Sequence, residues 1–387
     1  MSLPAFVLRP IRGLQAAFDA NIRPAPPTFS KSLGMALLFA FGLQILTGIT
    51  LAAHYAPTPT DAWGSLHQLE HHTLFGSFVR GLHHFGSSAV VVLSVLHLTQ
   101  ALMTGAYRRP RHKNWLLGVV MLFLVLGLGL TGYLLPWDQH GYWSTRVATG
   151  IIGEAPFGGL LQTLLLGGSD YGNATLSRFY GLHAFVLPGL LAVMTVFHVR
   201  AYFRHGPKHA DVPLADAPGP DAATPSPRPA LPYFPFQLIR DLVVMALVFA
   251  LLAALALALG ARLEAPADPA SDFEARPEWY FLFLYQLLQF FEGPMVFVGT
   301  TLVPALAAVF LLAVPFIDRE REPKAPGATR FPRAKIVKLV HLGLLAAVGG
   351  LTTYAIVSDQ SDSRYQKSRE KADREASLAT RLADQGG

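Results

Sequence analysis

The stretches GLHHFGSSAVVVLSVLHLTQ (81–100) and GLHAFVLPGLLAVMTVFHVR (181–200) carry the pattern from which the architecture can be predicted. Each is an apolar run of the length that crosses a bilayer as a helix, and each carries a histidine near both ends. His83 and His97 are 14 positions apart, and His183 and His198 are 15 apart, which corresponds to about 21 and 22 Å along a helix. A helix returns to within roughly 40° and 60° of its starting face after those intervals. Each pair is therefore expected to project from one side of its helix.

The neighbouring His84 is a competing ligand. It is 13 positions from His97, an interval that turns about 220° and ends on the far side of the helix, so His83 is preferred. Both runs cross in the same direction, which places His83 with His183 at one depth and His97 with His198 at the other. Two histidines facing each other at one depth can take both axial positions of a haem iron inside a helix bundle. The pattern predicts two stacked b-type haems, an outer and an inner one, bound through these four histidines.

The rest of the chain is typical of a membrane protein. Of its 387 residues 52% are hydrophobic and only 14% are charged, where about 25% is usual in soluble domains. The expected fold is an all-α membrane protein of seven transmembrane helices, the first four forming the di-haem bundle. The seven runs are Leu33–Ala53, Phe85–Tyr107, Trp115–Trp137, Phe179–Val199, Leu242–Ala261, Pro294–Ile317 and Leu339–Val357. Two shorter runs, Ile151–Gly168 and Trp279–Phe291, are expected to be interfacial helices in the loops 138–178 and 262–292.

The charges predict the orientation in the membrane. Loops on the N-terminal side hold 20 Lys and Arg against 8 Asp and Glu, and the opposite loops hold 5 against 11. Cytoplasmic loops carry the excess of Lys and Arg, so the N-terminus is expected in the cytoplasm and the C-terminus on the outer side. The net charge of +6 then reflects orientation in the bilayer, and no nucleic-acid partner is expected. Residues 1–32 lack the pattern of a cleavable signal.

Four regions follow from the composition along the chain. Residues 1–205 are expected to form the di-haem domain, and 236–358 a three-helix domain. Between them lies a Pro- and Ala-rich linker, 206–235, which is too polar and too rich in proline to form a core. The charged tail, 359–387, is expected to form a surface helix, and the sequence assigns no chemistry to it.

Cysteine and glycine restrict the cofactors further. The chain has no cysteine, which excludes iron–sulfur ligation and covalent haem attachment through a CxxCH motif within it. Glycines repeat the histidine spacing on the first and third apolar runs, 14 positions apart in each pair: Gly34 with Gly48, and Gly118 with Gly132. Glycine has no Cβ and lets a flat macrocycle approach the backbone. Ordinary tight helix packing is the alternative explanation, but the register with the histidines favours haem packing.

At this point the sequence resembles cytochrome b, the core subunit of the cytochrome bc and bf quinol oxidoreductases. The match is carried by GYLLPWDQHGYW (132–143), TLSRFYGLHAFVLP (175–188) and PEWY (277–280), together with the glycine and histidine pattern. The N-terminal half is similar to the chloroplast type, which is split into two chains, and this chain resembles those two parts fused through the linker. FPFQLIRD (234–241) is closer to the mitochondrial and bacterial type.

The resemblance implies a quinol–cytochrome c reductase subunit, or one with a similar acceptor, in an energy-transducing membrane such as the bacterial inner membrane. Family members oxidise quinol at the outer face and send one electron to a Rieske iron–sulfur protein and on to a c-type cytochrome. The other electron passes through the outer and inner haems to a quinone at the inner face, coupled to proton translocation. The resemblance therefore also implies partner subunits and a homodimeric complex in the lipid bilayer.

The resemblance also implies the outer site residues. Glu278 of PEWY is the candidate proton acceptor, since a carboxylate near an apolar pocket can have a raised pKa. Tyr280 and Tyr133 are candidate pocket residues or members of the interfacial aromatic belt. Arg80, one turn before His83, is a candidate partner of a haem propionate, with a lipid-headgroup anchor as the alternative.

At the inner face, the candidates for quinone binding and proton delivery are Asp241, Arg204, His205 and Lys31. Three positions depart from the family pattern. Gln100 replaces a frequent arginine, and Phe203 stands where the chloroplast type has one. Ser32 aligns with the cysteine that anchors a third haem covalently in the chloroplast type, so a covalent third haem is excluded and a non-covalent one stays open.

Two other functions compete with this interpretation. A di-haem anchor subunit of another oxidoreductase would share the haems and the quinone, but not PEWY or the PWDQ segment. A haem-free transporter would use the histidines as a proton relay. Broken spans and internal repeats would be expected in it, and this sequence shows no such repeat. Haem absorbance of the purified protein separates a transporter from the other two.

Overall fold

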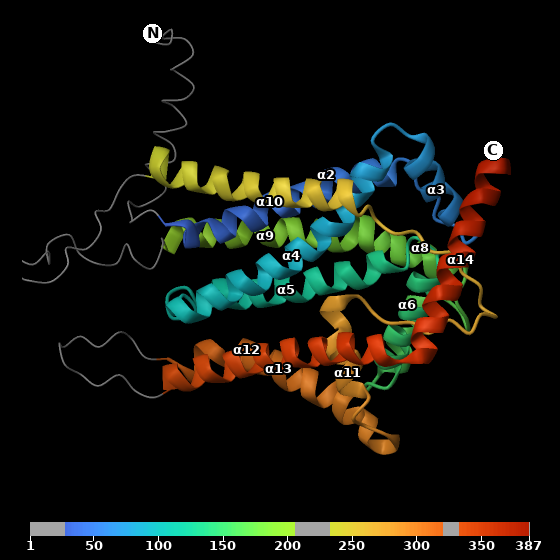
Figure 1. Ribbon diagram of the computed structural model, residues 1–387. Coiled ribbons are helices and arrows are strands. Elements are labelled where there is room, and N and C mark those ends of the chain that lie inside the picture. Colours follow the sequence, from blue (N-terminus) through green and yellow to red (C-terminus); the bar gives the residue numbers. More distant parts are fainter. Residues whose placement is uncertain (1–27, 206–232, 320–332, 387) are drawn as a thin grey trace, which may run out of the picture.

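The computed structural model describes residues 28–205, 233–319 and 333–386. Within them, seven helices are long and apolar enough to cross a membrane, and they lie side by side as one bundle (Figure 1). The predicted seven-helix fold is therefore confirmed. The helices are α2 (Leu33–Ala52), α4 (Gly76–Thr104), α5 (His112–Tyr133), α9 (Leu187–His205), α10 (Leu238–Ala258), α12 (Val303–Ile317) and α13 (Arg333–Ser361).

Short helical segments extend four of the spans. The first span begins in η1 (Phe29–Ser32), and the fifth in η5 (Tyr233–Gln237). The fourth continues from α8 (Asn173–Gly181) through η2 (Leu182–Val186), and the sixth from η7 (Gly293–Met295) through η8 (Val298–Leu302). The largest differences from the predicted bounds are at the starts of the second and fifth spans, which begin nine residues earlier than predicted, at Gly76 and Tyr233.

One end of the bundle carries most of the remaining helices and is called the outer end below (right in Figure 1). The predicted interfacial helix Ile151–Gly168 is divided between α6 (Gln139–Gly153) and α7 (Gly158–Leu166), with a turn between them. The predicted helix Trp279–Phe291 is observed as η6 (Trp279–Phe281) and α11 (Leu282–Leu288). The tail forms α14 (Ser363–Gly386), as expected, and α3 (Ala62–His72) was not anticipated.

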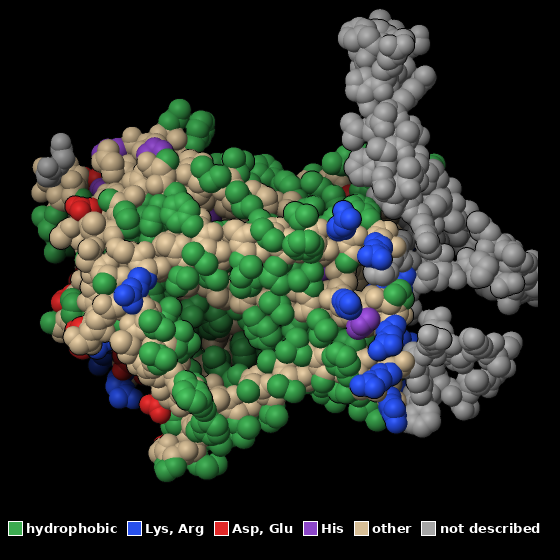
Figure 2. Space-filling model, turned by 180° about the vertical axis from the view of Figure 1, so that it is seen from behind, with side chains coloured by type: hydrophobic (Ala, Val, Ile, Leu, Met, Phe, Trp, Pro, Cys, Tyr) green, Lys and Arg blue, Asp and Glu red, His purple; other side chains and the backbone are tan. Residues whose placement is uncertain are grey.

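The side chains on the lateral surface of the bundle, between its two ends, suit contact with lipid. Large apolar side chains more than half exposed stand on several spans, including Leu46, Leu247, Leu257 and Leu306. Figure 2 shows hydrophobic side chains along the length of the molecule, with Lys and Arg most numerous at one end and Asp and Glu toward the other. Apolar flanks with polar ends are the pattern of a bilayer-spanning bundle.

The first four spans pack as pairs. Helix α2 packs along α4, α5 packs along α9, and α4 also contacts α5. Small and branched side chains form the core between them, among them Ala36, Ala40, Val90, Val125 and Leu191. Helix α10 lies against α2 and α4, so the fifth span joins this group, whereas α12 packs against α5 and α13. The proposed domain boundaries stay a prediction, and the linker up to residue 232 lies outside the described residues.

Loops from the two sequence halves are joined at the outer end by buried polar contacts. The indole nitrogen of Trp63 donates to the carbonyl of Glu264 (2.6 Å). The backbone N–H of Gln139 donates to the carbonyl of Ala265 (2.9 Å), and that of Ala267 to Trp137 (3.0 Å). These bonds fix the PWDQ segment against the loop that leads to PEWY.

Candidate functional site

The four predicted histidines form two facing pairs inside the bundle. The ring centroids of His83 and His183 are 6.1 Å apart, and those of His97 and His198 are 6.2 Å apart. Two imidazole nitrogens that each bind one metal ion at about 2.0 Å separate the ring centroids by roughly 6 Å. Both pairs therefore fit axial ligation of an iron ion. His84 instead lies against Phe85, with ring centroids 4.9 Å apart, which agrees with the choice of His83.

The unequal histidine spacing has a local structural cause. His183 lies in η2 (Leu182–Val186), a single turn of π-helix within the fourth span. A π-turn accommodates one residue more than an α-turn, so it offsets the extra residue between His183 and His198 relative to His83 and His97. The two pairs can then meet at two matched depths.

Hydrogen bonds orient the outer pair. Nδ1 of His83 lies 2.9 Å from the hydroxyl of Thr47, which itself donates to the carbonyl of Leu43 (2.7 Å). Nδ1 of His183 lies 3.0 Å from the carbonyl of Leu128, an atom that only accepts. In both rings Nδ1–H is thus the donor, and Nε2 is left as the basic nitrogen for a metal. By contrast, Nδ1 of His97 and of His198 is buried without a hydrogen-bond partner among the described residues.

Each of the four predicted glycines faces one of the four histidines. A Cβ at Gly34 would lie 3.4 Å from His97, one at Gly48 3.2 Å from His83, and one at Gly118 3.3 Å from His198. At Gly132 it would lie 2.4 Å from Cε1 of His183. At Gly132 the third span therefore passes too close to the ring to admit a Cβ, whereas at the other three glycines a Cβ would make a close contact. The close approach predicted for a macrocycle is seen here for the imidazole rings, and this arrangement fits a haem between them.

A cavity of about 300 Å³ at the outer end contains the candidate proton acceptor Glu278. The residues that line it come from separate parts of the chain and include His140, Arg276, Glu278, Trp279, Tyr365 and Gln366. Burial raises the pKa of the Glu278 carboxyl, and the charge of His140 opposes that rise. A half-buried carboxyl with a raised pKa can exchange a proton near the working pH.

His140 is a site residue that the sequence pattern did not indicate, although it lies in the segment GYLLPWDQHGYW (132–143). Its Nε2 is 2.7 Å from the carbonyl of Arg276 and must donate to it. The other ring nitrogen, Nδ1, is 2.9 Å from the hydroxyl of Tyr133. His140 thus links Tyr133 at the end of the third span to the backbone just before PEWY. A second donor, the Ser144 hydroxyl, reaches the same carbonyl at 2.9 Å.

Neither Tyr280 nor Arg80 lines this cavity. Tyr280 is buried in the bundle core, and a Cβ at Gly129 would lie 2.9 Å from its hydroxyl. Arg80 forms a buried ion pair with Glu70 and donates to the carbonyls of Ala261 (2.9 Å) and Arg262 (3.0 Å). The propionate role of Arg80 stays a prediction, and the structure adds a role in holding two outer loops together.

The predicted inner site is built around Asp241 at the start of the fifth span. Its carboxylate accepts from the hydroxyls of Ser32 (2.6 Å) and Tyr233 (2.7 Å) and from Nε2 of Gln237 (2.8 Å). The side chain is 1% exposed, so Asp241 ties the first span to the fifth. Of the other candidates, Arg204 is exposed at the end of α9 and Lys31 is half-buried in η1. Nothing is described of the His205 side chain.

Comparison with known proteins covers most of the chain. Residues 23–206 match the family described as cytochrome b/b6/petB, and residues 266–361 match the family described as cytochrome b (C-terminal)/b6/petD. A cytochrome bc complex cytochrome b subunit of Chlorobaculum thiosulfatiphilum is 34% identical over 301 residues, 76% of this chain and 68% of that protein. Cytochrome b6 of Prochlorococcus marinus (strain MIT 9303) is 39% identical over 185 residues, 47% of this chain and 85% of that protein.

The fold also matches a solved structure. A chain of a hyperthermophilic respiratory Complex III superposes with a TM-score of 0.72, covering 96% of this chain and 94% of its own length. The two sequences are 23% identical, so this match concerns the fold alone.

Proposed function

This chain belongs to the cytochrome b family, as the membrane subunit of a bc- or b6f-type quinol oxidoreductase, and we propose that it oxidises quinol at its outer end and carries electrons across the membrane between two b haems. The observation that carries the proposal is the arrangement of four histidines as two pairs, each about 6 Å across. We assign His83 and His183 to the outer haem and His97 and His198 to the inner haem.

The haems, when bound, supply one-electron carriers at two depths of the bundle. The chain contributes their orientation. Thr47 and the Leu128 carbonyl hold the outer imidazoles with Nε2 available. Gly34, Gly48, Gly118 and Gly132 leave room beside the four rings.

At the outer end we assign quinol oxidation to the region of the Glu278 cavity. Glu278 accepts a proton from the quinol hydroxyl, and its raised pKa brings the acceptor closer to the working pH. His140 and Tyr133 hold the segment before PEWY in place. Tyr280 supports the wall of the bundle beside it.

At the inner end we place a second quinone site near the start of the fifth span, close to Asp241, with Arg204, His205 and Lys31 as further candidates. The carboxylate of Asp241 already accepts three hydrogen bonds. We therefore assign Asp241 to shaping this end of the bundle and holding the first span in place.

Partners of this family complete the electron path. The chain has no cysteine, so a Rieske cluster and a covalently bound c-type haem reside on other subunits. We propose a c-type cytochrome as the acceptor and a homodimeric complex. The excess of Lys and Arg on one side supports a cytoplasmic N-terminus in a bacterial inner membrane or an equivalent one.

A potentiometric redox titration of the purified complex tests the haem assignment, with haem b absorbance followed and haem and quinone extracted in parallel. We expect two b haems per chain with separate midpoint potentials. His83→Ala is expected to remove the outer component, whereas the adjacent His84→Ala should retain both. One haem in the unmodified protein, or two in His83→Ala, would overturn the assignment.

A further inference from the structure

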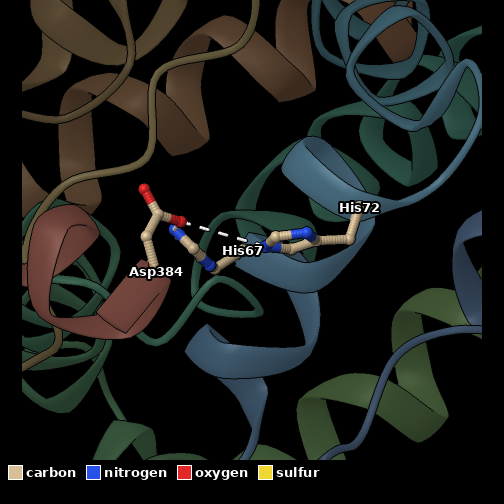
Figure 3. A group of neighbouring side chains, drawn as sticks. All are labelled: His67, His72 and Asp384. Atoms are coloured by element: carbon tan, nitrogen blue, oxygen red, sulfur yellow. Dashed lines mark ion pairs between the residues drawn. The ribbon is translucent and has the colours of Figure 1, made fainter. Parts of the chain in front are cut away.

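A cluster of metal-ligating side chains lies at the outer end, apart from the haem ligands and the Glu278 cavity. His67 and His72 stand on α3, and Asp384 stands near the end of the tail helix α14 (Figure 3). Nε2 of His67 is 3.5 Å and Nε2 of His72 is 3.8 Å from Oδ1 of Asp384. The three ligand atoms all lie within 4.8 Å of one another.

The burial and orientation of the His67 side chain fit a metal ligand better than a surface histidine. Only 4% of it is exposed, and its ring stacks on Trp63 with the planes 16° apart. Its Nε2 is buried and has no hydrogen-bond partner among the described residues, although it points toward Asp384 (Figure 3). A buried polar atom without a partner costs free energy, so a ligand at this nitrogen would be stabilising.

We propose that His67, His72 and Asp384 bind a divalent transition-metal ion, with Zn²⁺ as the best match. Two imidazoles and one carboxylate are typical zinc ligands, with water in a fourth position, whereas Ca²⁺ and Mg²⁺ prefer oxygen alone. Bonds of about 2.0 Å place the ligands of a tetrahedral ion roughly 3.3 Å apart. The two observed separations between a histidine nitrogen and the carboxylate, 3.5 and 3.8 Å, are only slightly longer. His72 and Asp384 are each 48% exposed and free to adjust, while His67 stays fixed.

The ion would complete the attachment of the tail helix. Along α14, Arg369 pairs with Glu264 (2.8 Å), Lys371 pairs with Asp272 (2.7 Å), and Asp373 pairs with Arg262. These contacts hold the first half of the helix onto the loop that precedes PEWY. A metal between α3 and Asp384 would secure the other end.

Metal binding by the purified complex tests the proposal. The complex is treated with EDTA, exchanged into metal-free buffer and dialysed against a series of Zn²⁺ concentrations, and bound zinc is measured by elemental analysis per haem b. Wild type is compared with Asp384→Asn and His72→Ala, which change exposed ligands, and with His71→Ala as the matched control. His71 is exposed on the same helix and lies outside the three-ligand group. The haem spectrum confirms that each variant is intact.

We expect wild type and His71→Ala to bind one zinc ion more than the two ligand variants, or to bind it at least tenfold more tightly. Zinc X-ray absorption of the loaded wild type should show two imidazole nitrogens in the first shell. Equal zinc content and affinity in wild type, Asp384→Asn and His72→Ala would overturn the site. A first shell of oxygen alone would also overturn it.

Discussion

Gly132 lies so close to His183 that a Cβ on the glycine would be 2.4 Å from Cε1 of the imidazole. The ring cannot turn aside freely, because its Nδ1 donates to the Leu128 carbonyl. We therefore expect Gly132→Ala to displace His183 and to remove the outer haem while the inner haem is retained. A redox titration of haem b absorbance should then show one component in place of two.

The matched control for this substitution is Gly127→Ala on the same helix. There the added Cβ would meet only Cδ1 of Leu187, at an ordinary 3.8 Å. Both haems should be retained in that variant. A Gly132→Ala protein with two haems at unchanged potentials would show that the close approach does not matter for ligation.

Thr47 offers a milder change at the other outer ligand. Its hydroxyl donates to the Leu43 carbonyl and so accepts the proton of His83 Nδ1. Thr47→Val removes this acceptor and makes the imidazole a weaker donor to the iron. Because a weaker donor stabilises the oxidised iron less, the outer midpoint potential should rise. A hydrogen bond worth about 1 kcal/mol corresponds to a rise on the order of tens of millivolts.

Thr50→Val is the control for this shift, since the Thr50 hydroxyl donates to the Leu46 carbonyl one turn along the helix. Its outer potential should equal that of the wild type. If Thr47→Val leaves the potential unchanged, or lowers it, the hydrogen bond does not tune the ligand in the proposed direction.

Periodicity was sufficient to predict the spans and the histidine pairs. The bilayer requires about 20 apolar residues in each span, and a helix has a fixed rise and turn. His83 and His97 could therefore be placed from their numbers alone. The 15-residue interval from His183 to His198 left a residual rotation that the sequence did not explain. The π-turn in η2 resolves it, and such a turn leaves no clear signal in composition.

Contacts between distant loops could not be predicted in the same way. Arg80 was expected to face a propionate, but its partners Glu70, Ala261 and Arg262 include residues about 180 positions away. The contact of His140 with Arg276 is equally non-local, at 136 positions. Hydrophobic periodicity does not predict which loops contact each other at the end of a bundle. The only available signal for His140 was its place inside the PWDQ segment.

The pH dependence of quinol oxidation should depend on Glu278. Burial raises its pKa above the usual value for glutamate, about 4.3. The ionised, proton-accepting form is therefore lost as pH falls through the raised pKa, and the rate should fall with it. This fall in rate at low pH is the acid limb of the pH profile. Glu278→Gln removes this acid limb and should lower the maximal rate about a hundredfold or more, as expected for the loss of a general base.

Unfolding of the Glu278→Gln variant is not expected to account for the lower rate. Folding raises the pKa of this carboxyl, so it favours the neutral form, and ionisation at higher pH costs stability. Glutamine is neutral at every pH and should be tolerated, which unchanged haem spectra would verify. An unaltered rate and pH profile in Glu278→Gln would assign proton acceptance to another group.

Two substitutions of His140 separate its charge from its hydrogen bond. The charge of His140 lowers the pKa of Glu278, and its Nε2–H holds the Arg276 carbonyl. His140→Gln keeps a donor for that carbonyl and removes the charge, so the acid limb should move to higher pH while the maximal rate stays within about twofold. His140→Leu removes both, so the limb should move in the same direction and the rate should fall severalfold as the segment before Glu278 loosens. Rates of quinol oxidation measured across pH in both variants test these expectations. An acid limb that does not move in His140→Gln would show that His140 and Glu278 do not interact. Equal maximal rates in the two variants would show that the hydrogen bond to Arg276 does not position PEWY.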